Sequence, residues 1–154
     1  MIQRISTALF FICVVTAAFI AGTLTAQEEK NLIASSVISL ETATLEKNDW
    51  GNFYTYYSGE SYGTKDVLTG IAVIKAGKQI HPPHTHAEEE YLMITEGQGT
   101  WHLNGKEFHA SKGDILYAAP WDVHGILNSS DKELTFVVWK WNNKGMALPE
   151  TPEN

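Results

Sequence analysis

The side chains best suited to chemistry in this chain of 154 residues are three histidines and a glutamate. His84, His86 and Glu90 lie within the run His-Thr-His-Ala-Glu-Glu-Glu, and His124 follows further along the chain. Imidazole nitrogens and carboxylate oxygens hold divalent transition metals, and a set of this size leaves coordination positions open for a substrate. The sequence therefore predicts a metal centre.

The spacing of the first three donors sets the local backbone. His84 and His86 are two residues apart, so both rings project from the same face of an extended chain. Glu90 has the same parity, but four residues of straight strand would carry it roughly 13 Å further on. Because ligand atoms lie about 2.0–2.2 Å from a metal such as zinc, the chain must bend after His86. We expect residues 87–89 to form a turn between strands.

The first 26 residues predict an export signal. They contain one positive charge, Arg4, then an apolar run from Ala8 to Ile20, and then small residues up to Ala26, which is the layout of a secretory signal peptide. The alternative is an uncleaved membrane anchor, because the apolar run is near the lower length limit for a spanning helix. We expect a periplasmic or extracellular protein, cleaved after Ala26.

Charge and cysteine content restrict the partners. The formal net charge is −7, and an acidic surface repels phosphate backbones and anionic lipid. Nucleic acid and membrane surfaces beyond the signal segment are therefore poor candidates. Arg4 is the only arginine and Cys13 the only cysteine, so the exported domain has no disulfide and no guanidinium to clamp an anion. The expected ligand is a small neutral or weakly anionic molecule.

The rest of the chain predicts one all-β domain. We assign residues 27–48 to an N-terminal arm or edge strand, 49–142 to a β-barrel and 143–154 to a flexible tail. Short β-type runs separated by glycine-bearing turns are typical of an antiparallel sandwich or barrel. These runs cover residues 53–57, 67–74, 91–95, 99–103, 106–109, 115–118, 123–128 and 134–141. Asn104-Gly105 predicts a two-residue type I′ hairpin.

Two stretches resemble the two motifs of the cupin family. The first reads Gly77-x6-His84-x-His86-x3-Glu90-x6-Gly97, with one extra residue before the first histidine. The second reads Gly113-x6-Pro120-x3-His124-x3-Asn128, with the proline shifted by one and Asp122 near where a glycine is usual. The resemblance covers about residues 70–141 and is closest to small single-domain bacterial cupins. It implies a double-stranded β-helix, a small jelly-roll barrel with the metal inside.

The resemblance also implies the ligands and the assembly. It assigns one divalent transition metal ion to the side chains of His84, His86, Glu90 and His124. The donor set does not choose among Fe, Mn, Ni, Cu and Zn, because availability decides between metals of similar affinity. Together with a candidate edge strand between Leu32 and Leu45, the resemblance predicts a homodimer.

Further side chains near the motifs are candidates for contact with a substrate. Glu90 and Asp122 are candidate proton-transfer groups, with Glu89 as an alternative, and His81 is expected at the rim of the pocket. Four aromatic residues near the motifs are expected to line the substrate pocket: Tyr91, Trp101, Tyr117 and Trp121.

Three functions follow from such a centre. The first is metal-dependent dioxygenation of a small organic molecule, as in quercetinase-like cupins. The second is Lewis-acid isomerisation, epimerisation or lyase chemistry on a sugar derivative. The third is binding of a small ligand without turnover. Oxygen uptake would indicate the first function. Activity with zinc in the absence of oxygen would indicate the second, and binding without product the third.

Overall fold

The computed structural model describes residues 32–152, so the predicted signal segment and the first residues of the arm lie outside the described part. The described chain forms nine strands and no helix, and thus no helix that could span a membrane. The strands are β1 (Thr44–Asn48), β2 (Gly51–Gly59), β3 (Thr64–Ile74), β4 (Glu89–Glu96), β5 (Gln98–Leu103), β6 (Lys106–Ser111), β7 (Ile115–Ala118), β8 (His124–Leu127) and β9 (Leu134–Asn143).

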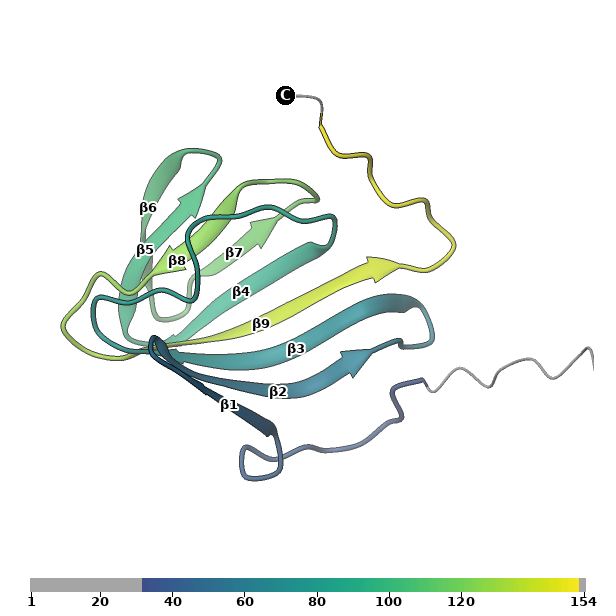
Figure 1. Ribbon diagram of the computed structural model, residues 1–154, viewed down its shortest axis with the longest axis horizontal. Coiled ribbons are helices and arrows are strands. Elements are labelled where there is room, and N and C mark those ends of the chain that lie inside the picture. Colours follow the sequence, from purple (N-terminus) through teal and green to yellow (C-terminus); the bar gives the residue numbers. More distant parts are fainter. Residues whose placement is uncertain (1–31, 153–154) are drawn as a thin grey trace, which may run out of the picture. The chain divides into compact units, whose positions relative to one another are not determined.

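The strands form two antiparallel sheets. One has six strands in the order β1-β2-β3-β9-β4-β7, and the other has three in the order β6-β5-β8 (Figure 1). Strands β3 and β4 are not neighbours, because β9 returns from the end of the chain and pairs with both. The all-β, double-stranded β-helix prediction is confirmed.

Alternating side chains along β9 explain how the larger sheet covers the core. Leu134, Phe136 and Val138 are buried, while the residues between them face outward. The pattern is that of a strand with one face on the core. Leu92 and Ile94 of β4 repeat it, opposite Val138 and Phe136 respectively.

The smaller sheet closes the core from the other side. Trp101 of β5, Ala110 of β6 and Ile126 of β8 are buried in the same cluster as the inward residues of the larger sheet. The apolar core thus lies between the two sheets, as in a jelly roll.

The predicted hairpin is confirmed. Asn104 and Gly105 have φ angles of 49° and 75°, the left-handed values that a type I′ turn requires at both central positions. Leu103 and Lys106 are paired on either side of the turn. All eight predicted β-type runs overlap strands of the structure.

Part of the predicted arm joins the larger sheet. Residues 44–48 form β1, an edge strand that pairs with β2. Further upstream, Leu32 makes a single parallel bridge to Glu60.

Candidate metal centre

The loop between β3 and β4 is joined to the start of β8, which brings two histidines together. The backbone amide of His84 donates to the carbonyl of His124, and the amide of His124 donates back, each at 2.9 Å. Pro83 lies so close to Gly125 that a Cβ there would be 3.2 Å from the Pro83 Cα. The backbone therefore fixes where both rings begin.

Two further contacts place the other predicted donors. The amide of Trp121 donates to the carbonyl of His86 at 2.8 Å, which ties the loop to the residues just before β8. Glu90 is the second residue of β4 and is buried. The chain bends between them as expected, since β4 begins only at Glu89.

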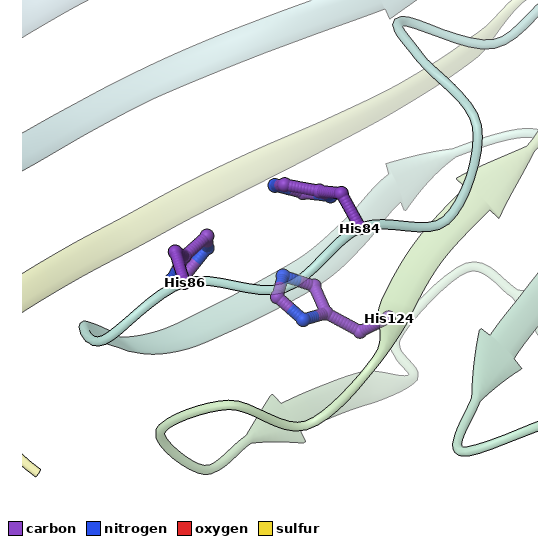
Figure 2. Close-up of side chains that lie close together, drawn as sticks. All are labelled: His84, His86 and His124. Atoms are coloured by element: carbon purple, nitrogen blue, oxygen red, sulfur yellow. The ribbon is translucent and has the colours of Figure 1, made fainter. Parts of the chain in front are cut away.

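The structure brings all four predicted donors together. The ligand atoms of His84, His86 and His124 all lie within 4.8 Å of one another, and Figure 2 shows the three rings gathered around one point. The carboxylate oxygens of Glu90 lie 3.3 Å from the Nε2 of His86 and 3.3 Å from the Nε2 of His124. The three histidines lie close enough to bind one metal ion.

Backbone carbonyls select the tautomer of two rings. The Nδ1 of His124 is 2.8 Å from the carbonyl oxygen of Asp122, and the Nδ1 of His86 is 3.1 Å from that of Glu88. A carbonyl can only accept, so each Nδ1 carries a proton. In the neutral ring, Nε2 is then left with a free lone pair, which is the form that binds a metal.

Unsatisfied nitrogens show that the site fits a cation. The Nδ1 of His84 and the Nε2 atoms of His86 and His124 are buried without a hydrogen-bond partner. Although Glu90 approaches both Nε2 atoms, the geometry does not meet the requirements of a hydrogen bond. Each such buried group costs about 1–3 kcal/mol when left unpaired, and a bound divalent ion would give these nitrogens and the carboxylate a common partner.

The charges and the burial of the cluster favour the metal-binding protonation states of His84 and Glu90. Burial, followed by the neighbouring His81, His124 and His86, lowers the pKa of His84 to about 4. Burial alone would raise the pKa of Glu90, but the rings of His124 and His86 outweigh it and lower that pKa to about 2. Near neutral pH, His84 is therefore neutral and Glu90 ionised, the forms that coordinate.

The pKa of His124 shifts in the opposite direction to that of His84. Burial lowers its pKa, but Glu90 and the carbonyl of Asp122 outweigh burial, so the net shift is upward. The carboxylate of Glu90 therefore favours the protonated form of His124, whereas metal binding would require the neutral ring.

A cavity of about 250 Å³ opens beside the cluster. His84, Glu90 and His124 lie in its wall, with His81 next to them, as expected for a rim residue. Most of the remaining wall is apolar: Trp50, Phe53, Leu68, Ile80, Leu92, Ile126, Phe136 and Val138. Its charged groups outside the cluster are Glu46 and Lys140.

The aromatic residues predicted to line the pocket lie elsewhere. Tyr91 faces the outer side of the larger sheet, where its ring packs on Tyr117 at 4.7 Å and stacks on Trp141 at 5.7 Å between ring centroids. Parity explains this placement, because Glu90 and Leu92 on either side of Tyr91 point inward.

The two tryptophans of the prediction are also absent from the wall of this cavity. Trp101 is 4% exposed and packs in the core between the sheets. Trp121 has a φ of 68°, and its Nε1 donates to the carbonyl of Pro149 in the C-terminal segment. That contact turns the indole toward the tail.

Asp122, a predicted proton-transfer group, instead makes hydrogen bonds that hold the loop before β8. One carboxylate oxygen accepts from the Nδ2 of Asn104 at 2.8 Å, and the other accepts from the amide of Ala119 at 3.3 Å. Its backbone carbonyl holds the ring of His124. The structure gives Asp122 a positioning role and keeps its carboxylate out of the cavity wall.

Sequence reasoning missed most residues of the cavity wall. Phe53 belongs to it because Gly70 has no side chain, and a Cβ there would be 2.5 Å from the Phe53 Cζ. Lys140 belongs to it because it shares the inward parity of Phe136 and Val138 on β9. That parity was visible in the sequence, but the pairing of β9 with β4 was not.

Comparison with known proteins agrees with this architecture. Residues 70–140 match the family described as "Cupin domain", a segment that contains all four donors. This part of the chain is a cupin domain.

Solved structures share the fold. A "predicted oxalate decarboxylase" from Thermotoga maritima superposes with a TM-score of 0.58 at 21% identity, covering 69% of this chain and 98% of that one. A double-stranded β-helix protein from Klebsiella pneumoniae superposes with a TM-score of 0.57 at 24% identity, covering 77% and 100%. At these identities the likeness concerns the fold alone.

A sequence relative is a gentisate 1,2-dioxygenase from Streptomyces, 24% identical over 82 residues. The aligned part is 53% of this chain and 23% of that protein. The chain spans about a quarter of the length of the curated relatives that it matches.

Proposed function

We propose that this cupin holds one divalent transition metal ion on His84, His86, Glu90 and His124 and uses it to oxidise a small organic molecule with O₂. The observation that carries the metal site is the convergence of three buried, unsatisfied imidazole nitrogens beside an ionised carboxylate. The metal, when bound, supplies positions at which a substrate oxygen and O₂ can bind together.

The protein's own residues determine which side of the site is open. Three of the four donors, His84, Glu90 and His124, lie in the cavity wall, so the free coordination positions would face the cavity. A carboxylate with a pKa near 2 is a weak base, which suits Glu90 better as a ligand than as the proton carrier that the sequence suggested.

The character of the wall favours dioxygenation over sugar chemistry. Trp50, Phe53, Phe136 and their aliphatic neighbours offer contact surface and few hydrogen-bond partners. Against these side chains a sugar derivative would leave hydroxyl groups unpaired, whereas an aromatic ring would be well packed. The similarity to a gentisate 1,2-dioxygenase supports the same choice.

The test is oxygen consumption by the reconstituted full chain. The protein is loaded anaerobically with Fe(II), Mn(II), Ni(II), Cu(II) or Zn(II) and mixed with single-ring diols and hydroxy acids. We expect oxygen uptake with a redox-active metal and none with zinc. Product formed with zinc in the absence of oxygen would favour the Lewis-acid function instead, and tight binding without product would favour a binding protein.

We also propose that the protein works outside the cytoplasm, as a homodimer. The support is the signal-like segment at residues 1–26 and, for the dimer, the edge strand β1 with its exposed Leu45. Cell fractionation with N-terminal sequencing tests the export, and light scattering of the purified chain tests the dimer.

A further inference from the structure

Lys140 lies in the cavity wall and is not one of the four candidate metal ligands. It lies on β9 directly opposite Glu90 on β4, and side chains of directly paired residues project from the same face of a sheet. Lys140 and Glu90 both line the cavity. Lys140 is therefore a neighbour of the metal donors in the cavity wall.

The ion pair that Lys140 makes is loose. Its Nζ lies 3.8 Å from an Oε1 of Glu88, at the outer limit for a salt bridge, and 23% of the side chain is exposed. The other carboxylate oxygen of Glu88 lies 3.3 Å from the Nδ1 of His86. Glu88 thus lies between the ring of His86 and Lys140. The ammonium group of Lys140 has three N–H donors, so it can also donate to a further anion.

The surroundings of Lys140 define what it would bind. One side of the cavity carries the metal donors and most of the remainder is apolar, with Leu68 paired opposite Lys140 on β3. A ligand that fills this space needs an oxygen for the metal, a flat apolar body and an anionic group for the ammonium. The volume of about 250 Å³ is below the range of about 300–1,000 Å³ typical of drug-sized ligands, so a single ring fits better than a fused polycyclic compound.

We propose that Lys140 is the specificity-determining residue of this site and that the substrate is a single-ring aromatic acid, with ring oxygens on the metal and a carboxylate on Lys140. The inference rests on the proposed metal function. An aromatic acid is within the weakly anionic class expected from the sequence, because a lysine beside the metal can hold an anion as a point charge.

The test compares two probes that differ in charge and little in shape. Zinc-loaded full-length protein is titrated by calorimetry with 3,4-dihydroxybenzoate and with 3,4-dihydroxybenzamide. We expect the wild type to bind the acid roughly ten- to a hundredfold more tightly than the amide, because a charge-assisted hydrogen bond to the ammonium is lost with the amide.

Variants locate the source of that preference. Lys140→Met should bind both probes equally, Lys140→Arg should keep most of the preference, and the exposed-surface control Lys112→Met should keep all of it. Zinc content is measured for every protein. A wild type that retains zinc but has no preference, or a Lys140→Met variant that keeps it, overturns this inference and leaves the metal site intact. A wild type that does not retain zinc overturns the proposed function and this inference together.

Discussion

Strands β4 and β9 run side by side, and the side chains at the two ends of this pair differ in character. At one end Ile94, Leu134 and Phe136 are 0–2% exposed and fill the space between the sheets with apolar side chains. At the other end the same inward positions carry Glu90 and Lys140, which face a cavity. The pairing of β4 with β9 therefore joins a packed core to a polar site.

The difference between the two ends shows how this fold can contain a site that lowers the stability of the folded protein. Buried nitrogens without partners reduce stability, while close-packed aliphatic side chains increase it. The packed end holds the strands in register, and the register holds Glu90 in place. Stability should therefore respond to mutations at the packed end, and metal binding to mutations at the cavity end.

The largest change in the free energy of unfolding is expected from a mutation at the packed end. Leu134→Ala removes a fully buried side chain, so the free energy of unfolding should fall by about 2–5 kcal/mol. Urea denaturation of the metal-free protein measures it. Leu148→Ala, at a position 48% exposed, is the matched control and should change little. Similar values for the two variants would show that the packed end does not carry the stability.

For His86 at the cavity end, the main loss of stability should appear in the presence of metal. A metal at a hundred times its dissociation constant adds about 2.7 kcal/mol to the stability of the native state, and His86→Ala should abolish that gain. Thermal unfolding with and without zinc measures the difference. His109→Ala, on the exposed hairpin, should keep the full gain. A zinc-dependent rise in Tm that survives in His86→Ala would contradict the ligand assignment.

In the metal-free protein, a smaller change in stability should depend on pH through Glu90 and His124. The lowered pKa of Glu90 gives stability above 4.5, the unfolded value, that is lost as pH falls toward about 2. The raised pKa of His124 gives stability below 6.5 that is lost as pH rises through its folded value. Glu90→Gln should therefore be most destabilising between pH 4.5 and 6.5. Urea titrations across pH check this, and a pH-independent difference would refute the pairing.

The smallest effect is expected on the outer face of the sheet. Tyr117 is 42% exposed and donates to an Oε1 of Glu89 at 3.1 Å, away from the cavity wall. Tyr117→Phe should change stability by less than about 0.5 kcal/mol and leave ligand binding unchanged. Calorimetric titration with 3,4-dihydroxybenzoate tests it. A clear loss of binding would return Tyr117 to the pocket, where the sequence had placed it.

Local patterns in the sequence were enough for the strands and the donors. Asn104-Gly105 identified its hairpin because few residues other than glycine and asparagine accept positive φ. The spacing from His84 to Glu90 required a bend, and β4 begins where that bend ends. The four donors come together as the motif resemblance implied.

Long-range pairing is what the sequence did not reveal. Tyr91 and Trp101 were assigned to the pocket because they are near the motifs, but one faces outward and the other packs in the core. Phe53 and Lys140 reach the cavity through pairings of β2 with β3 and of β9 with β4. These contacts join residues far apart in the chain, and periodicity along one strand does not specify its partner.

Metal analysis tests the central claim most directly. The full chain, purified anaerobically, is incubated with a divalent metal, freed of excess and analysed beside His124→Ala and the control His109→Ala. We predict about one equivalent of metal in the wild type and in the control, and less than about one-tenth of an equivalent in His124→Ala. Less than one-tenth of an equivalent in the wild type, or equal metal in all three proteins, would contradict the account.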